Sequence, residues 1–279
     1  MTRPVACIIG WPVSHSRSPM IHRYWLRRLG IDGDYVAAPV EPARIDAFLS
    51  RFAGSGFVGG NVTVPYKEAA FAAVAEADDV ASALGAVNTL SLADGRLIGS
   101  NTDAYGFLAN LDAAAPGWDN NGGTAIVLGA GGAARAVVWS LLQRQLAPVV
   151  VVNRTLERAE LLAARLGDEV RPVAWSALPG WLPKARILVN ATSLGMRGQP
   201  PLEIDIDALP ASATAGDLVY APLETQLLRA ARRRGLAAVS GLGMLIHQAV
   251  PGFQSWFGKR PVVTDELYSL VAADLEKKV

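Results

Sequence analysis

The sequence has few of the features that mark several large protein classes. It contains one cysteine, Cys7, so no internal disulfide can form, and no zinc-ligand spacing is present. Its 26 basic and 25 acidic residues give a net charge of +1, which provides no electrostatic reason to expect nucleic acid or a membrane surface as partner. No apolar run is long enough to span a bilayer, and the first residues lack a signal-peptide pattern. We therefore expect a cytoplasmic protein that uses no metal.

The chain does have the length and apolar content for two hydrophobic cores. Its 279 residues, 51% of them hydrophobic, suit a two-domain enzyme. Cys7 lies in the apolar run of residues 5–9, which is more typical of a buried strand residue than of a reactive thiol. No heptad or apolar strip indicates a subunit interface, so monomer and homodimer both stay open.

A glycine-rich segment in mid-chain has the pattern of a dinucleotide-binding turn. Residues 124–128 predict a buried strand, and residues 133–145 predict the helix that follows. In the pattern G-x-G-x-x-G/A, Gly129 permits a tight turn, Gly131 lets the backbone approach a pyrophosphate, and Ala134 keeps the helix near the sheet. A flexible turn between strand and helix is the alternative. Since such units usually open their own domain, we expect the preceding residues to form another domain that holds the reaction partner of the nucleotide.

The next strand indicates which dinucleotide binds. Residues 148–152 predict a second buried strand, which ends in Asn153-Arg154-Thr155. An NAD-binding unit usually has Asp or Glu at this point, to bond the ribose 2′-hydroxyl, whereas Arg suits a 2′-phosphate. The sequence therefore favours NADP over NAD.

The first hundred residues alternate between strand and helix patterns. This alternation predicts an α/β domain with a mainly parallel sheet covered by helices. Strands are expected at residues 5–10, 35–40 and 57–64, helices at 19–29, 43–52 and 67–76, and a hairpin with strands 86–92 and 96–99.

Polar residues stand where these strands are expected to end. Ligands of open α/β sheets bind beyond the carboxyl ends of the strands. The hydroxyls and amides expected there suit a hydroxylated small molecule, and they lie in Ser14-His15-Ser16-Arg17-Ser18, Asn61-Val62-Thr63, Asn88-Thr89 and Asn101-Thr102-Asp103.

A series of segments along nearly the whole chain resembles, in order, the motifs of the shikimate dehydrogenase family. They are residues 10–19, 60–67, 85–89, 99–103, 129–132, 153–155, 190–196 and 241–248. The resemblance implies NADPH-dependent reduction of 3-dehydroshikimate to shikimate, a step in the synthesis of aromatic amino-acid precursors. It also implies an N-terminal α/β substrate domain and a Rossmann-like NADP-binding domain that flank a cleft.

The resemblance assigns the chemistry to Lys67 and Asp103. Hydride transfer to a ketone leaves negative charge on its oxygen, so a positioned acid must supply a proton. Lys67 is the candidate acid, and Asp103 would pair with it, orient it and lie near the reacting hydroxyl. The alternatives are a solvated lysine in the first turn of a helix and an N-cap aspartate.

Further site residues follow from the same motifs. Substrate-binding residues implied by the resemblance, besides Lys67 and Asp103, are Ser16 and Ser18 for the carboxylate, Thr63, Asn88 and Gln248 for the ring hydroxyls, and Tyr220 near the carboxylate. Ser18, Thr63 and Gln248 also have ordinary structural roles open to them. Cofactor-binding residues would be Gly129, Ala130, Gly131, Gly132, Ala133, Asn153, Arg154, Thr155, Thr192, Ser193, Met196, Gly241 and Met244.

The domain boundaries expected on this basis are 1–103 for the substrate domain, 104–240 for the NADP domain and 241–279 for helices that return to the first domain. One departure from the family pattern is Ala221, where Asn is usual between Tyr220 and Pro222. A quinate or dual quinate/shikimate dehydrogenase is the enzymatic alternative, and a non-catalytic nucleotide-binding homologue is the other.

Overall fold

The computed structural model describes residues 3–277, which divide into two compact units. The first unit combines the segment that ends at Asp103 with Ile246–Val271. The second combines Ala104–Leu245 with the segment that begins at Ala272. The chain therefore passes between the units within three helices, α5 (Asp103–Ala114), α9 (Gly241–His247) and α11 (Asp265–Lys277).

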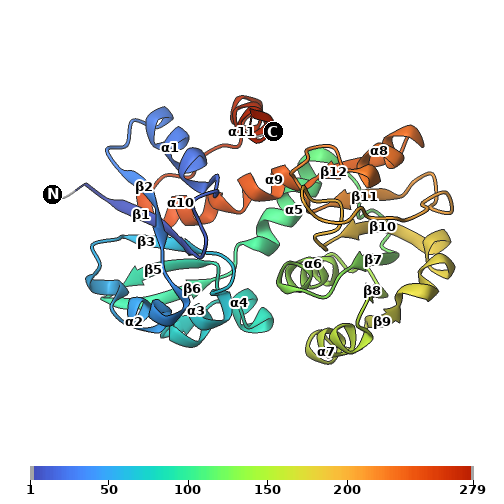
Figure 1. Cartoon of the computed structure of the whole chain (residues 1–279), viewed down its shortest axis with the longest axis horizontal. Helices are drawn as coiled ribbons and strands as arrows, with labels where there is room; N and C mark the ends of the chain where they lie inside the picture. The colour runs from blue at the N-terminus through green and yellow to red at the C-terminus, as the bar shows by residue number, and fades with distance from the viewer. Residues whose placement is uncertain (1–2, 278–279) are drawn as a thin grey trace. The chain divides into compact units, whose positions relative to one another are not determined.

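The first unit contains a mixed six-stranded sheet in the order β2-β1-β3-β5-β6-β4 (Figure 1). Its strands are β1 (Val5–Gly10), β2 (Asp34–Pro39), β3 (Gly59–Val62), β4 (Glu76–Ala77), β5 (Thr89–Ala93) and β6 (Arg96–Ser100). Strands β2, β1 and β3 are parallel, as the alternating pattern predicts. Strand β5 is antiparallel to both β3 and β6, and β5 and β6 form the expected hairpin.

Helices cover both faces of this sheet. They are α1 (Ser18–Arg28), α2 (Ile45–Ser50), α3 (Lys67–Ala73), α4 (Asp79–Leu84) and α10 (Ala249–Phe257), with 3-10 turns η1 (Pro42–Arg44) and η2 (Phe52–Gly54). The continuous helix expected at residues 43–52 is wrong, because 3-10 turns replace its ends and leave six α-helical residues between them. Cys7 is fully buried in the core, as expected, and burial raises the pKa of its thiol to about 12.

Alternate residues of β1 point to different cores. Cys7 and Ile9 pack in the cluster that includes α2 and α3, whereas Ala6 and Ile8 pack with Tyr35 and Trp256. Helix α10 is fixed on this second face by Trp256, whose Nε1 donates to the Leu90 carbonyl at 2.8 Å. Helix α10, although it comes late in the chain, therefore belongs to the core of the first unit.

The second unit contains a fully parallel sheet in the order β12-β11-β10-β7-β8-β9. Its strands are β7 (Thr124–Leu128), β8 (Val149–Asn153), β9 (Val170–Ala174), β10 (Ala185–Asn190), β11 (Thr214–Asp217) and β12 (Ala237–Ser240). The remaining elements are α6 (Gly132–Gln143), α7 (Leu156–Leu166), α8 (Gln226–Arg233), η3 (Trp175–Gly180) and η4 (Leu182–Lys184). Both faces of the central strands are buried, which explains their continuous apolar runs.

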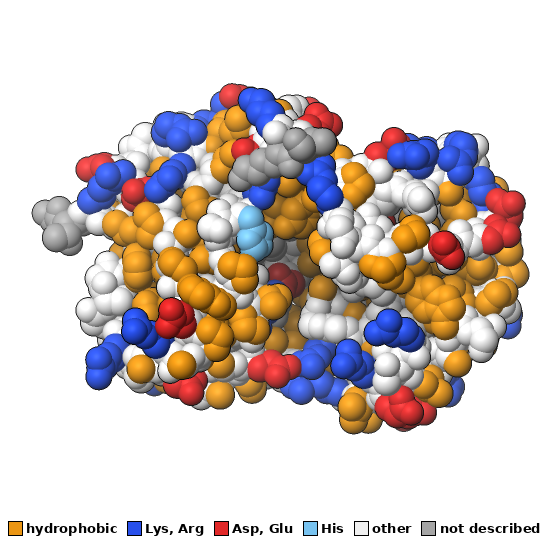
Figure 2. All heavy atoms as spheres, viewed as in Figure 1, with side chains coloured by type: hydrophobic (Ala, Val, Ile, Leu, Met, Phe, Trp, Pro, Cys, Tyr) orange, Lys and Arg blue, Asp and Glu red, His pale blue; other side chains and the backbone are white. Residues whose placement is uncertain are grey.

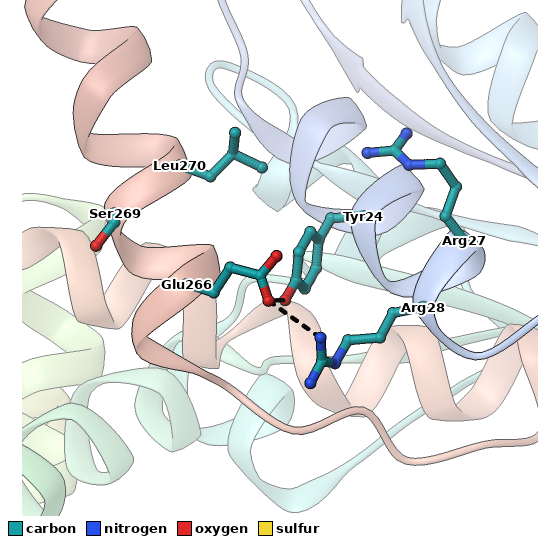
Figure 3. A pocket seen from close by; sticks show the side chains of 6 residues that line it. All are labelled: Tyr24, Arg27, Arg28, Glu266, Ser269 and Leu270. Atoms are coloured by element: carbon teal, nitrogen blue, oxygen red, sulfur yellow. Dashed lines mark hydrogen bonds and ion pairs between the residues drawn. The ribbon is translucent and has the colours of Figure 1, made fainter.

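Helices α1 and α11 meet at a polar contact within the first unit (Figure 3). The Glu266 carboxylate accepts hydrogen bonds from the Tyr24 hydroxyl at 2.8 Å and from the Arg28 guanidinium at 3.0 Å. These side chains line an open pocket with Arg27, Ser269 and Leu270. None of the residues expected to bind substrate or cofactor lines this pocket.

The distribution of charged side chains on the surface agrees with the net charge of +1. Figure 2 shows acidic and basic side chains on the same face, and neither sign covers it. Within residues 3–277, no helix combines the length and apolar character that crossing a membrane requires.

Candidate active site

Strand direction brings the polar segments of the first unit to one edge of its sheet. Strand β3 ends at Val62 and β6 ends at Ser100, while β5, which is antiparallel to both, begins at Thr89. The expectation that Asn88 and Thr89 stand at a carboxyl end is therefore wrong. They lie at the amino end of β5, and they join the same edge because that strand runs in the opposite direction.

The Lys67 ammonium and the Asp103 carboxylate form an ion pair. Lys67 is the first residue of α3, and its carbonyl accepts a hydrogen bond from the Val87 amide at 2.9 Å. Asp103 is the first residue of α5. Their side chains are 26% and 13% exposed, so the pair is partly withdrawn from water yet open to a ligand. The two residues meet as expected, and their catalytic role stays a prediction.

Asp103 has further partners that fix its position. Its Oδ1 accepts a hydrogen bond from Asn88 Nδ2 at 2.8 Å, and its backbone amide donates to Asn101 Oδ1 at 3.0 Å. The Asn101 side chain thus accepts from the first amide of α5, which leaves the Asp103 carboxylate for Lys67 and Asn88. Asn88 is 2% exposed, and its Oδ1 accepts from the Thr102 amide at 2.8 Å. Sequence analysis placed Asn101 and Thr102 among the polar groups at this edge, but it did not predict that they would hold Asp103 and Asn88 in position.

The expected substrate-binding hydroxyls and amides lie in both units. Ser18 is the first residue of α1 and is buried, and its amide donates to the Ser16 hydroxyl at 3.2 Å. The N-cap position of α1 is Arg17, whose side chain makes no capping hydrogen bond, so Ser18 does not cap this helix. Thr63 directly follows β3, and Gln248 stands between α9 and α10 in the first unit. Tyr220 lies in the second unit, after β11.

The glycine-rich turn joins β7 to α6 in the second unit. Gly129 has φ +104°, and a Cβ there would lie 2.9 Å from Thr192 Cγ2, so both conformation and space require glycine. Gly131 and Gly132 differ, because their φ angles are not positive and a Cβ on either would meet nothing within 4 Å. Protein packing therefore does not explain these two glycines. The open space over the N-terminus of the 12-residue helix α6 fits an approaching pyrophosphate, which the helix dipole would favour.

The segment Asn153-Arg154-Thr155 connects β8 to α7. The Asn153 side chain donates to the Thr155 carbonyl at 2.7 Å, which ties the turn together. Arg154 is exposed, and within residues 3–277 no acidic side chain pairs with it. An exposed, unneutralised guanidinium beside the N-terminus of α7 fits the 2′-phosphate of NADP.

A buried carboxylate supports the loops that follow β10 and β11. Asp217 is 1% exposed, and burial raises the pKa of its carboxyl group. It accepts from Asn190 Nδ2 at 2.9 Å, the Val219 amide at 3.0 Å and the Thr225 hydroxyl at 2.6 Å. Asn190 Oδ1 in turn accepts from the Thr192 hydroxyl at 2.7 Å. Asp217 and Asn190 were not among the expected site residues, and they hold Thr192 and the start of the Tyr220 segment.

The other expected cofactor residues have mixed environments. Met196 is 39% exposed beyond Ser193, whereas Met244 packs against the core of the second unit. A Cβ at Gly241 would lie 2.2 Å from the Leu218 carbonyl oxygen, so close approach of the chain to itself already requires glycine there. The Ala221 carbonyl accepts from the Arg197 amide at 2.7 Å, a backbone contact that needs no asparagine side chain.

Comparison with known proteins identifies matching family models and relatives. Three family models match: the shikimate dehydrogenase substrate binding domain at residues 8–90, shikimate/quinate 5-dehydrogenase at 113–196, and the shikimate 5′-dehydrogenase C-terminal domain at 241–263. The chain is 57% identical to shikimate dehydrogenase (NADP⁺) of Azorhizobium caulinodans, over 97% of this chain and 96% of that protein. It is 56% identical to the Methylocella silvestris protein of the same name, over 98% of each chain.

Solved structures extend the comparison. Shikimate 5-dehydrogenase of Thermus thermophilus, in complex with NADP(H) and shikimate, matches with a TM-score of 0.85 at 37% identity, over 98% of this chain and 99% of that chain. Quinate dehydrogenase of Corynebacterium glutamicum in complex with NAD matches with a TM-score of 0.89 at 30% identity, over 97% and 99% of the two chains. The motifs, the two-unit fold and these relatives together place the chain in the shikimate dehydrogenase family.

Proposed function

We propose that this protein is an NADP-dependent shikimate dehydrogenase that interconverts 3-dehydroshikimate and shikimate. The observation that carries the proposal is the Lys67–Asp103 ion pair, which joins residues 36 positions apart in the sequence. A ligand-binding homologue without activity would not need a partly buried cation with a dedicated carboxylate partner. The relatives with the highest identity reported above bear the name of this activity.

Lys67 and Asp103 account for the proton transfer. When bound, NADPH supplies the hydride that reduces the ketone carbon. Lys67 then gives its proton to the ketone oxygen as charge develops there, which produces the hydroxyl group of shikimate. In the opposite direction the same pair removes the hydroxyl proton. Because Asp103 both pairs with Lys67 and accepts from Asn88, it holds the ammonium in one place while the proton moves.

Polar side chains would select the substrate. Hydroxyls at Ser16 and Ser18 can donate to a carboxylate, and Thr63, Asn88 and Gln248 offer hydroxyl and amide groups to a polyol ring. Tyr220 would bind near the carboxylate. These assignments are proposals supported by the family motifs and by the position of Thr63 and Asn88 at the sheet edge that also holds Lys67 and Asp103.

NADP(H) is the cofactor. The turn Gly129–Ala133 would hold the pyrophosphate, and Asn153, Arg154 and Thr155 would surround the 2′-phosphate. Gly241 and Met244 would line the nicotinamide, and Thr192, Ser193 and Met196 would complete the cofactor site.

An absorbance assay of nucleotide reduction tests the activity. We expect the protein to oxidise shikimate with NADP, with a much lower kcat/KM for quinate and for NAD. Quinate dehydrogenase is the second candidate, because a solved quinate dehydrogenase shares this fold over nearly the whole chain. Equal or better kcat/KM with quinate would replace shikimate by quinate as the substrate.

The Lys67→Ala variant tests the mechanism. Since a general acid acts mainly in the transition state, kcat should fall about 10²- to 10⁴-fold, with a much smaller change in KM for shikimate. Circular dichroism should confirm that the variant is folded. Near-normal kcat at saturating shikimate would remove Lys67 from the reaction and leave it as a structural ion-pair residue.

A further inference from the structure

Asn61 is a buried polar residue that the mechanism above does not use. It lies in β3, is 4% exposed, and forms three hydrogen bonds inside the first unit. Its Oδ1 accepts from the Tyr35 hydroxyl at 2.7 Å, and its Nδ2 donates to Thr89 Oγ1 at 3.1 Å and to the Asn88 carbonyl at 3.2 Å. Because Asn61 is almost completely buried, its three hydrogen-bond partners indicate its structural role.

The bonds of Asn61 have a defined direction. The Tyr35 hydroxyl donates to Asn61 Oδ1, so the amide nitrogen of Asn61 faces β5. Thr89 Oγ1 accepts from that nitrogen, which leaves the single hydroxyl hydrogen of Thr89 to be donated onward. Its acceptor at 3.0 Å is Asn88 Oδ1, and Thr102 Oγ1, which itself contacts Asn88 Oδ1, lies 3.2 Å away. Each group therefore orients the next one in this series of hydrogen bonds.

This series of hydrogen bonds ends at the Asp103 carboxylate, which is proposed to be catalytic. Asn88 Oδ1 must face donors, because it receives the Thr102 amide at 2.8 Å as well as the Thr89 hydroxyl. The Asn88 amide nitrogen consequently points the other way, and it donates to Asp103 Oδ1 at 2.8 Å. A reversed Asn88 amide would place oxygen against the Asp103 carboxylate, which is repulsive.

We propose that Asn61 is a positioning residue for the reaction: acting through Thr89, it fixes the orientation of the Asn88 amide and thereby the Asp103 carboxylate that pairs with Lys67. The inference rests on the proposed function, since it gives Asn61 an effect on turnover. A merely structural role would lower stability and leave kcat unchanged. Asn61 touches neither member of the ion pair in these contacts, so its effect is transmitted by hydrogen bonds.

The experiment compares Asn61→Leu, of similar size but without hydrogen-bonding groups, with Leu49→Ala. Leu49 is buried in the hydrophobic core of the same unit and takes no part in these hydrogen bonds. Leu49→Ala therefore serves as the matched control for loss of stability. We expect Asn61→Leu to lower kcat for shikimate oxidation about tenfold, as loss of one oriented hydrogen bond allows, with KM for NADP unchanged. Leu49→Ala should lose stability in urea unfolding and keep its kcat. Wild-type kcat in folded Asn61→Leu would overturn the proposal.

A double-mutant cycle with Asp103→Asn provides the readout that a structural role would not change. If Asn61 acts through Asp103, Asn61→Leu should lower kcat much less in the Asp103→Asn background than in wild type. An equal fold-loss in both backgrounds would overturn the proposal. Should Asp103→Asn and Lys67→Ala themselves keep normal kcat, the proposed mechanism would fail before this inference is reached, so the two failures are distinguishable.

The Thr89→Val variant provides a second test of the proposal, which can be used if Asn61→Leu does not fold. Valine preserves the shape of the threonine side chain and removes only the hydroxyl that links Asn61 to the Asn88 side chain. We expect kcat to fall about threefold or more, because Thr102 still holds one side of the Asn88 amide. Folded Thr89→Val with wild-type kcat would overturn the proposal.

Discussion

Residues of the proposed substrate and cofactor sites differ in whether their charges are already paired within the protein. Lys67 and Asp103 are partly buried and already paired, so their charges are held in place before substrate binds. Arg154 is exposed and has no acidic partner within residues 3–277, so its charge remains available to an anion. A proton-transfer group benefits from a fixed position, whereas an anion-binding group benefits from an unneutralised charge.

Arg154 should determine the preference for NADP. Charge-assisted hydrogen bonds contribute about 1.5–3 kcal/mol, so Arg154→Ala should raise KM for NADP tenfold or more. KM for NAD, which has no 2′-phosphate, should change little. Steady-state kinetics with both nucleotides measure this, and Arg158→Ala, a change at an exposed arginine within α7, is the control. An unchanged KM for NADP in Arg154→Ala would show that Arg154 is an ordinary solvated residue.

At the scale of elements, the turn between β7 and α6 separates glycines needed for folding from glycines available for binding. Gly129 has positive φ and lies against Thr192, while Gly131 has φ −86° and open space where a Cβ would be. The same sequence motif therefore contains two kinds of constraint. Only the backbone angles and the neighbouring atoms distinguish them.

Gly129→Ala should consequently affect mainly stability, and Gly131→Ala mainly NADP binding. Gly129→Ala should lower the free energy of unfolding by about 1–3 kcal/mol through backbone strain and contact with Thr192. Gly131→Ala should change it by less than about 1 kcal/mol, the scale of an N-cap substitution, yet raise KM for NADP severalfold. Urea unfolding and steady-state kinetics measure the two quantities. If Gly131→Ala binds NADP as tightly as wild type, the pyrophosphate does not approach Gly131.

At the scale of the whole molecule, stability depends on buried titratable groups. His22 is fully buried, and its ring stacks on Tyr35 with 4.0 Å between centroids and an interplanar angle of 4°. Burial lowers the pKa of His22 to about 3 from an ordinary value of 6.5. As the pH falls below 6.5, His22 binds a proton in the unfolded chain but stays neutral in the folded protein. The free energy of unfolding therefore decreases between pH 6.5 and pH 3.

His22→Phe should remove this part of the acid sensitivity. Because one pKa unit corresponds to about 1.36 kcal/mol, His22 alone should cost the wild type about 2 kcal/mol of unfolding free energy between about pH 7 and pH 5. The decline should be smaller by that amount in His22→Phe, and His15→Gln, a change at an exposed histidine, should decline like wild type. Urea unfolding at the two pH values tests this. Parallel declines in wild type and His22→Phe would refute a neutral His22 in the folded protein.

The sequence alone was sufficient to predict the family, the fold class and most of the strands. Apolar periodicity located β1, β7 and β8 to within a residue, because each is buried and bounded by turn residues. The motifs identified the shikimate dehydrogenase family, which the relatives confirm. The roles of the site residues, the functional domain boundaries and a cytoplasmic location stay predictions, and the choice between monomer and homodimer stays open.

The tertiary structure decided which polar groups meet. Local periodicity does not encode strand direction, so the antiparallel course of β5 and the resulting place of Asn88 could not be read from residues 86–92. Hydrogen bonds of Asn61 with Tyr35 and Thr89 join positions 26 and 28 apart, and such pairs leave no signal in a single sequence. Residue types and local pattern thus determined the elements and the available chemistry, whereas pairing between distant segments determined the orientation of Asp103, because hydrogen bonds depend on positions in space.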